Sequence, residues 1–196
     1  NESNFESSKE LKAIDNFEHN FIFLTNGKII STNFVHEEKG KILIKDFNQE
    51  EVMNIDPSNA LELLNSALLS GGFSLEIAKD YKLKKPLIVY NCFSQDLKNK
   101  ILNSKNFIKL NEGSELTLID YSDNNSQNNF IKNTVDTISL DKNAVLKNVL
   151  IQSSKNNGHF YKYIKSSLES GSNYENYILS SGLKLNKIEI EINLNK

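Results

Sequence analysis

Leu110-Asn111-Glu112-Gly113-Ser114 says most about the architecture of this chain, because its pattern returns twice further along the sequence. Leu140-Asp141-Lys142-Asn143-Ala144 and Leu168-Glu169-Ser170-Gly171-Ser172 also contain a leucine, two polar residues, a glycine or asparagine, and a small residue. The leading leucines are 30 and 28 residues apart, and Leu194 follows 26 residues later. Repetition at this period indicates stacked units, because one such unit cannot bury its own apolar face.

Each copy lies between runs with strand character, such as 107–110 before the first copy and 115–119 after it. The glycine or asparagine can turn the chain through left-handed backbone space, and the small residue lets the next strand begin close by. Corners at fixed places in the repeat predict an all-β fold, a parallel β-helix (solenoid) whose turns stack on one another. A β-sandwich is the alternative, although it would not need this element at such similar intervals.

Ile77-Ala78-Lys79-Asp80-Tyr81 is a degraded first copy, 33 residues before Leu110. The Asn-rich stretch 122–129 is expected to bulge from a corner as a loop. Further runs with alternating or continuous apolar residues are predicted strands: 73–77, 87–90, 134–140, 145–152, 159–168, 174–179 and 184–194.

The chain before residue 73 is organised differently. Asn26-Gly27 between the apolar runs 21–24 and 29–30 predicts a hairpin, and 42–44 predicts another strand. Asp56-Pro57 is typical of a helix start, Leu61, Leu64 and Leu68 follow at helical spacing, and Gly71-Gly72 ends the run. We expect this helix to cover one end of the strands that follow.

These patterns divide the chain into three parts. Residues 1–20 are predicted to be a poorly ordered or helical N-terminal remnant, and 21–72 a strand hairpin with a capping helix. Residues 73–196 are predicted to form the β-helix core, truncated at its C-terminal end. Because residue 1 is not Met and the last repeat stops at Lys196, we expect the chain to be a piece of a longer protein.

Composition limits the possible partners and compartments. The net charge is −2 and all 23 basic residues are lysine, which disfavours nucleic acid and anionic membranes as partners. Cys92 is the only cysteine, so a reducing, cytoplasmic compartment is expected. The sequence contains no apolar run long enough for a membrane span and does not open with a signal peptide.

The residues able to carry metal or thiol chemistry are few and scattered. Cys92 follows the run 87–90 and is expected to be a small apolar residue at a strand end. His19, His36 and His159 have no further ligand at metal-binding spacing, so we interpret them as solvent-facing strand residues rather than ligands.

Charged clusters are also interpreted structurally. Asp120 and Asp123 resemble a cation loop but lack the EF-hand pattern, so a solvated corner is expected. Glu189 and Glu191 alternate with isoleucines, which predicts the outer face of a half-buried strand rather than a catalytic acid pair. The only basic cluster is expected to protect a solvated edge strand rather than bind nucleic acid: Lys79, Lys82, Lys84 and Lys85. No catalytic, cofactor-binding or metal-binding residue is predicted.

The order of the motifs resembles the SufB/SufD family of iron–sulfur cluster assembly proteins. Residues 64–77 followed by Lys84-Lys85-Pro86-Leu87-Ile88 resemble the entry to the family's core, and 110–118 matches its strand–acidic–glycine–small–strand element. Residues 130–140 and 143–152 resemble two further family strands, and Ser181-Gly182 resembles a family corner. Phe23-Leu24-Thr25-Asn26-Gly27 is more similar to SufD than to SufB. The resemblance covers about residues 20–196.

The resemblance implies a right-handed parallel β-helix in a non-catalytic scaffold subunit. In this family SufD pairs with SufB, the ATPase SufC joins them, and iron–sulfur clusters are built on the complex. The family's N-terminal helical region, the SufB–SufD contact at the end of the β-helix and the C-terminal helices have no counterpart in this sequence. No functional residue is therefore carried over, and no cofactor is expected to be bound by this stretch itself.

Two other functions stay open from the sequence. A secreted β-helical carbohydrate-active enzyme would use a groove lined with acids and aromatic residues. A self-associating structural β-helix would polymerise. In addition, the unpaired edge of the last turn predicts a homodimer through the β-helix edge.

Overall fold

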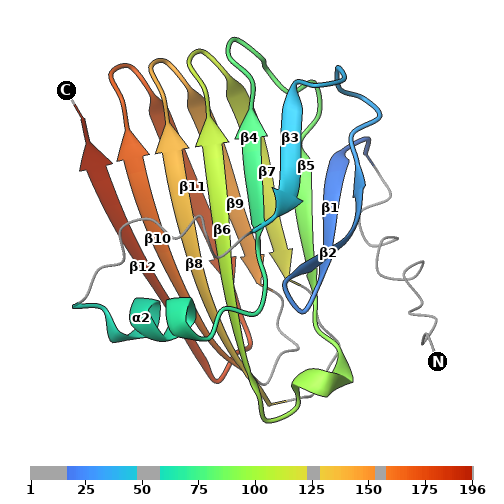
Figure 1. Cartoon of the computed structure of the whole chain (residues 1–196), viewed down its shortest axis with the longest axis vertical. Helices are drawn as coiled ribbons and strands as arrows, with labels where there is room; N and C mark the ends of the chain where they lie inside the picture. The colour runs from blue at the N-terminus through green and yellow to red at the C-terminus, as the bar shows by residue number, and fades with distance from the viewer. Residues whose placement is uncertain (1–16, 48–57, 123–128, 153–157, 196) are drawn as a thin grey trace.

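The computed structural model of the protein describes residues 17–47, 58–122, 129–152 and 158–195. The chain folds into a β-solenoid of about four turns, formed by two sheets of six strands each (Figure 1). In spatial order one sheet, here called sheet A, consists of β11 (Asn173–Ser180), β9 (Val145–Gln152), β7 (Glu115–Ser122), β5 (Leu87–Cys92), β1 (Asn20–Thr25) and β2 (Lys28–Asn33). Sheet B consists of β12 (Leu185–Leu194), β10 (His159–Leu168), β8 (Ile131–Leu140), β6 (Ile101–Leu110), β4 (Phe73–Ile77) and β3 (Ile42–Asp46). The predicted solenoid is therefore confirmed, and the β-sandwich alternative is wrong.

The leucines of the repeat form one continuous column at the end of sheet B. Leu110 pairs with Leu140, Leu140 with Leu168, and Leu168 with Leu194. The degraded copy belongs to the same column, since Ile77 pairs with Leu110. The repeat spacing in the sequence is therefore the length of one turn of the solenoid.

The corner after each leucine turns through left-handed backbone conformations. The φ angles are +57° at Asp80, +68° at Gly113, +58° at Asn143 and +74° at Gly171. Neighbouring corners are joined by hydrogen bonds, such as the 2.9 Å bond that the Gly113 amide donates to the Lys142 carbonyl. The small residue that follows is fully buried at Ser114 and Ala144, because it faces the interior where the next strand begins.

The N-terminal strands extend the two sheets at one end of the solenoid. Asn26 and Gly27 have φ angles of 51° and 79°, as the predicted tight hairpin between β1 and β2 requires. β1 also pairs in parallel with β5, so the hairpin joins sheet A directly. β3 pairs antiparallel with β4 in sheet B. The antiparallel strands β2 and β3 are thus the last strands of the sheets at this end.

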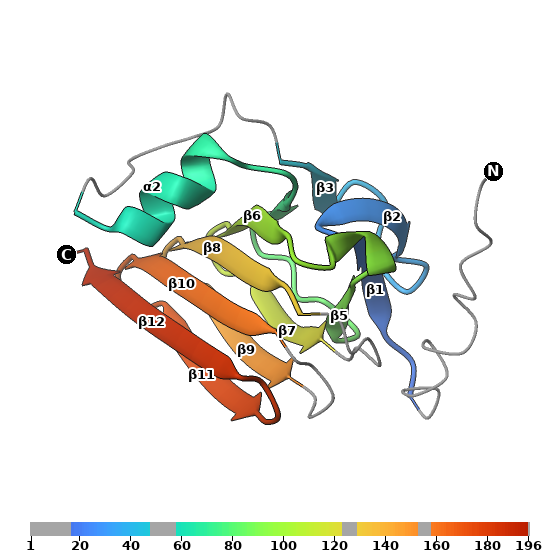
Figure 2. The same ribbon diagram turned by 90° about the horizontal axis from the view of Figure 1, so that it is seen from below.

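Helix α2 (Ala60–Ala67) does not lie where the sequence predicts, and its fully buried residues are Glu62 and Asn65 rather than the leucines. Its N-cap is Asn59, whose side-chain oxygen accepts hydrogen bonds from the amides of Leu61 and Glu62; the predicted start at Asp56-Pro57 lies outside the described residues. The helix lies on the outer face of sheet B, against β6 and β8, and not over an end of the solenoid (Figure 2).

The main hydrophobic core fills the space between the sheets. It includes Leu75, Leu110, Leu116, Leu140 and Leu146, each at most 2 % exposed. A second cluster lies toward the opposite corners, around the short 3-10 helix η3 (Gln95–Leu97): Phe93, Leu97, Leu102, Phe130 and Phe160. Most of the loop predicted at 122–129 lies outside the described residues.

Candidate functional site

The interior of the solenoid contains a charged cluster beside the hydrophobic core. Strand alternation explains its position, because Asp120 follows the inward-facing Leu116 and Leu118 of β7 at the same parity. Likewise, Lys132 and Asp136 share the inward face of β8 with Ile138 and Leu140. The part of each strand farthest from the leucine corner is therefore polar on its inner side.

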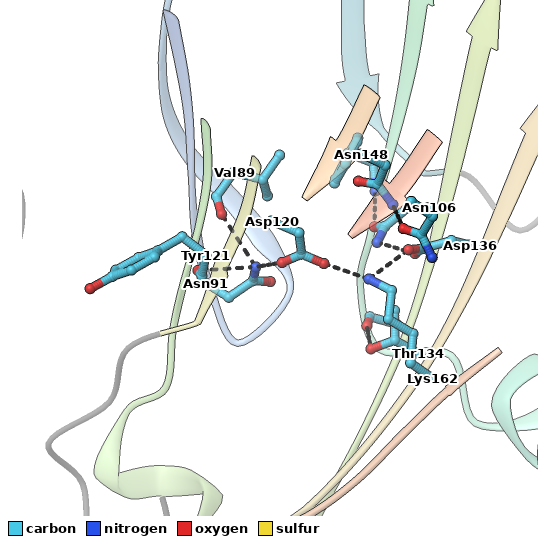
Figure 3. Close-up of polar contacts among 12 residues, drawn as sticks. Val89, Asn91, Asn106, Asp120, Tyr121, Thr134, Asp136, Asn148 and Lys162 are labelled. Carbon is cyan, nitrogen blue, oxygen red and sulfur yellow. Dashed lines mark hydrogen bonds and ion pairs between the residues drawn. The ribbon is translucent and has the colours of Figure 1, made fainter. Parts of the chain in front are cut away.

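Lys162 of β10 lies between the two carboxylates of this cluster (Figure 3). Its Nζ is 2.5 Å from Asp120 Oδ2 and 2.6 Å from Asp136 Oδ2. The side chains of all three residues are at most 16 % exposed, so water screens these ion pairs little. Lys162 thereby joins sheet A to sheet B through the interior.

Asparagine side chains donate further hydrogen bonds to the two carboxylates. Asn91 Nδ2 donates to Asp120 Oδ1 at 2.6 Å, and Asn106 Nδ2 donates to Asp136 Oδ1 at 2.8 Å. Below them, the hydroxyls of Ser104 and Thr134 lie 3.0 Å apart. Each carboxylate thus has both an ammonium and an amide donor, as a buried charge needs to be stable.

The pKa values follow from these partners. Burial alone would raise the pKa of Asp120, but the charges of Lys162 and Lys132 and the hydrogen bonds from Lys162 and Asn91 lower it. Burial acts to lower the pKa of Lys162, and the two aspartates overcome it and raise the pKa. Asp120 and Lys162 are therefore ionised at neutral pH, and Lys162 also pairs with the buried carboxyl group of Asp136.

Lys132 is the second cation of the interior and has a different environment. Its Nζ lies 5.2 Å from the ring centroid of Phe93 and 5.6 Å from that of Phe160, while both aspartates bond to Lys162 instead. Burial lowers the pKa of Lys132 to about 8, although Asp120 and Asp136 partly oppose this effect. Lys132 is thus the group of this cluster whose charge changes at mildly alkaline pH.

A small cavity of about 40 Å³ adjoins the cluster, and Asp120, Lys132 and Lys162 are among its lining residues. Hydroxyl and amide groups at the ends of the sheet A strands also line it: Ser122, Gln152 and Ser180. The cavity is large enough for a small polar molecule of the size of water. Its described charged lining residues are one carboxylate, Asp120, and two ammonium groups, Lys132 and Lys162; Asp136, the second carboxylate of the network, does not line it.

The structure describes no metal centre in the ranges 17–47, 58–122, 129–152 and 158–195: no three His, Cys, Asp or Glu side chains lie close enough to hold a metal ion there. Cys92 is the last residue of β5 and is 6 % exposed, as expected for an apolar residue at a strand end. His159 begins β10 and is half-buried. His19 lies just before β1 and is half-buried, with Nε2 3.0 Å from the Tyr90 hydroxyl, and His36 lies half-buried in the connection after β2. The expectation of solvent-facing strand positions is therefore wrong for these two residues, because both lie in connections beside the strands.

The basic cluster does not lie on an edge strand, so that interpretation was wrong. It lies in the connection from β4 to β5, where Lys82 forms an isolated parallel bridge with Glu115. Each lysine has a carboxylate partner, which leaves little free charge for a nucleic acid: Lys79 with Glu112 at 2.7 Å, Lys82 with Glu115, Lys84 with Glu38 at 3.6 Å, and Lys85 with Glu18 at 2.6 Å.

The expected outer-face position of Glu189 and Glu191 is confirmed. Tyr161 donates a 2.5 Å hydrogen bond to Glu189, and Tyr163 donates one to Glu191. Burial and then the Glu189 carboxylate raise the pKa of Tyr161 to about 12. Both acids therefore hold tyrosines on the outer face of sheet B.

The expectation of a solvated corner is wrong for Asp120, and Asp123 lies outside the described residues. Asp120 is inside the solenoid because β7 extends to Ser122, two residues past it. The alternation Leu116, Leu118, Asp120 could have shown this, as could Lys132, Asp136, Ile138 in β8. Sequence reasoning missed the whole interior network for the same reason.

Comparison with known proteins identifies one family. Residues 93–196 match the family described as SUF system FeS cluster assembly, SufBD core domain. A search of curated protein sequences finds no significant match. The matched residues include the β-strands from β6 to β12 and therefore most of the interior network. The structure also describes no helix with the length and hydropathy of a membrane-crossing helix in its part of the chain.

Proposed function

Because the chain belongs to the family of SUF-system iron–sulfur cluster assembly proteins with a SufBD core domain, we propose that it acts as a SufD-like scaffold subunit. Membership of this family carries the proposal, since the match spans more than half of the chain and places it in SUF cluster assembly. The iron–sulfur cluster is the cargo of the system, and this stretch of chain binds no cofactor of its own in the proposal.

The assignment to SufD rather than SufB rests on the N-terminal hairpin. Phe23-Leu24-Thr25-Asn26-Gly27 is the element that resembles SufD, and it forms the end of β1 and the turn to β2. The hairpin belongs to the same sheet as the matched strands, because β1 pairs with β5 and β5 with β7. This support lies outside residues 93–196, so it is separate from the family match.

A non-catalytic role fits the chemistry of the interior. Lys162 pairs with both Asp120 and Asp136, so these two carboxylates of the described interior stabilise the two sheets and are engaged rather than free to act as a general acid or base. The half-buried acids Glu189 and Glu191 on the outer face are likewise engaged by tyrosines. In the proposal the chain acts by assembly in the cytoplasm, with a SufB-like subunit and the SufC-like ATPase as partners.

Co-expression tests the proposed partners. The chain, carrying an affinity tag, is produced together with SufB-like and SufC-like proteins of the same organism and purified by affinity and size exclusion. We expect both partners to co-elute with it, and the absence of either would contradict the proposal. The control is the untagged chain carried through the same purification.

Complementation separates SufD from SufB. The gene that contains this chain is introduced into two bacterial strains that depend on the SUF system, one lacking SufD and the other lacking SufB. Rescue of iron–sulfur enzyme activity in the first strain only supports the proposal. Rescue of the second strain only would assign the chain to SufB instead.

A further inference from the structure

The cavity of about 40 Å³ inside the solenoid has largely apolar walls, to which Leu150, Ile178 and Ile188 contribute. Ser180 and Asn186 also line it, and both are exposed where β11 ends and β12 begins. The cavity therefore reaches the surface between these two strands. One water molecule needs about 10–15 Å³ of such space, so a molecule of only a few non-hydrogen atoms fits inside.

Lys132 lines this cavity from β8 and is a buried amine without a hydrogen-bond acceptor in the part of the chain that the structure describes. The residue is 7 % exposed. The contacts of its Nζ there are with the faces of two rings, those of Phe93 and Phe160, and neither ring accepts an ordinary hydrogen bond. The hydrogens of this amine are thus available to a molecule in the cavity.

Lys162 lines the same cavity but is kept protonated by its two ion pairs with Asp120 and Asp136 (Figure 3). Lys132 differs, because burial lowers its pKa to about 8 and the charge of Lys162 acts in the same direction, while Asp120 and Asp136 partly oppose both. A lysine that is desolvated beside another cation is more often neutral near pH 7, and the neutral amine is the nucleophile. Of the two interior lysines, Lys132 is therefore the reactive one.

The charges around Lys132 favour a reaction that keeps its positive charge. The charged groups described beside it are Asp120, Asp136 and Lys162, so a cationic Lys132 makes two positive charges against two negative ones. Acylation of the amine would remove one positive charge. Condensation with an aldehyde keeps it: the nitrogen forms a double bond to the carbonyl carbon, the carbonyl oxygen leaves as water with two hydrogens of the ammonium, and the iminium product carries the same single charge.

We propose that Lys132 is a nucleophilic amine that takes up a short aliphatic aldehyde from the cavity as an iminium. The apolar walls suit the hydrocarbon part of such a molecule, and the size of the cavity limits that part to one or two carbon atoms. The site is independent of the assignment to SufD, because it depends only on side chains inside the solenoid. It adds a covalent binding site to a chain proposed to be a scaffold.

Reductive alkylation at pH 7 tests the site. The purified chain is incubated with acetaldehyde and cyanoborohydride, which reduces an iminium to a stable N-ethyl amine, and peptide mass spectrometry follows each lysine over time. We expect Lys132 to be ethylated at least roughly tenfold faster than the exposed Lys147, since roughly 10 % of an amine with a pKa of about 8 is neutral at pH 7, against less than about 0.1 % of an ordinary lysine. Lys162 should stay unmodified, because both aspartates hold it as an ammonium group.

The size of the aldehyde and the opening of the cavity provide two controls. Benzaldehyde is too large for a space of about 40 Å³, so it should alkylate Lys147 but not Lys132. Ser180→Phe narrows the opening between β11 and β12, and it should slow the ethylation of Lys132 at least roughly tenfold while leaving Lys147 unchanged. Circular dichroism and the unfolding midpoint establish that the variant is folded.

Three outcomes would overturn the proposal. The first is ethylation of Lys132 that is no faster than that of Lys147. The second is equal reaction of Lys132 with benzaldehyde and acetaldehyde, which would show that it reacts only when the solenoid opens. The third is an unchanged rate at Lys132 in folded Ser180→Phe, which would show that the aldehyde does not enter through the cavity.

Discussion

Lys162 is the residue on which the charge network inside the solenoid depends. It is the only ammonium group within ion-pair distance of both Asp120 and Asp136 in the part of the chain that the structure describes. The pairs are buried, so each aspartate is stable in its charged form only while Lys162 is present. This dependence makes the network sensitive to single substitutions.

Lys162→Met is expected to lower the free energy of unfolding by about 3–5 kcal/mol, because it leaves two buried carboxylates without their cation. Urea unfolding at pH 7, followed by circular dichroism, measures the loss. The matched control is Lys147→Met on β9, whose side chain is exposed, and it should change the stability by less than about 0.5 kcal/mol. Equal midpoints for the two variants would contradict the role of Lys162.

Lys132 is expected to make the stability rise with pH above neutrality. Its pKa is about 8 in the folded chain and about 10.4 in an unfolded chain, so between these values the unfolded state binds the extra proton. The free energy of unfolding should therefore increase from pH 8 to about 9.5, by at most on the order of 3 kcal/mol. Below pH 8 both states are protonated and the full destabilisation is present.

Chemical denaturation at several pH values measures this slope, and Lys132→Met is its control. The variant should be more stable than the wild type at pH 7 and should lack the rise. A wild-type stability that is flat or falls between pH 8 and 9.5 would show that Lys132 keeps an ordinary pKa.

The corners were predictable from the sequence because their chemistry is local. A residue with positive φ is needed at each turn, and glycine and asparagine accept this conformation most readily. Gly113, Asn143 and Gly171 therefore marked the turns directly. No turn residue marks Asp120; its inward direction follows from alternation with Leu116 and Leu118, which holds only because β7 extends past it to Ser122.

Helix α2 shows a second limit of prediction from sequence. Its leucines follow helical spacing, yet Leu68 is 57 % exposed and the fully buried positions are Glu62 and Asn65. Hydrophobic periodicity assumes that a helix packs through apolar side chains. Here Leu61 does pack against Tyr161 and Tyr163 of sheet B, but the fully buried side chains of the helix are polar, and no periodicity of apolar residues reveals them.

Asn65→Ala is expected to loosen α2 from sheet B. The Asn65 amide donates to the carbonyls of Ser104 and Asn133 at 2.9 and 2.8 Å, and their loss should cost about 1–3 kcal/mol. Amide hydrogen exchange across 60–67 measures the effect, and we expect faster exchange there. Leu63→Ala is the control, because Leu63 is on the same helix and 42 % exposed. If both variants exchange alike, Asn65 does not anchor the helix.

The assembled solenoid has an end at which apolar side chains are exposed. Ile178 and Leu179 of β11 and Ile190 and Ile192 of β12 are 42–62 % exposed, and these strands are the last of their sheets. The leucine repeat predicts from the sequence that the strand ending at Leu194 belongs to the last turn, because Leu194 continues the column formed by the earlier leucines. The sequence predicts a homodimer through this edge but not its geometry, since a strand edge accepts any chain that supplies matching hydrogen bonds.

We expect the purified chain to form dimers through this end as its concentration rises. Ile178→Lys/Ile190→Lys should shift the equilibrium to monomers, because charged side chains on an edge oppose pairing. Sedimentation velocity over a range of concentrations measures the change. Ile30→Lys is the control, since Ile30 is 63 % exposed in β2 at the other end. A wild-type chain that stays monomeric throughout would contradict the expectation.

The strands β2 and β3 make the two ends of the solenoid different. Both run against their neighbours, whereas every other pairing described in the two sheets is parallel. A further turn with parallel strands can therefore be added only at the β11 and β12 end. At the opposite end the antiparallel strands β2 and β3 interrupt the parallel pattern. When two molecules pair through their β11 and β12 edges, neither has another such edge exposed, so association stops at the dimer. We therefore expect dimers of this chain rather than fibres.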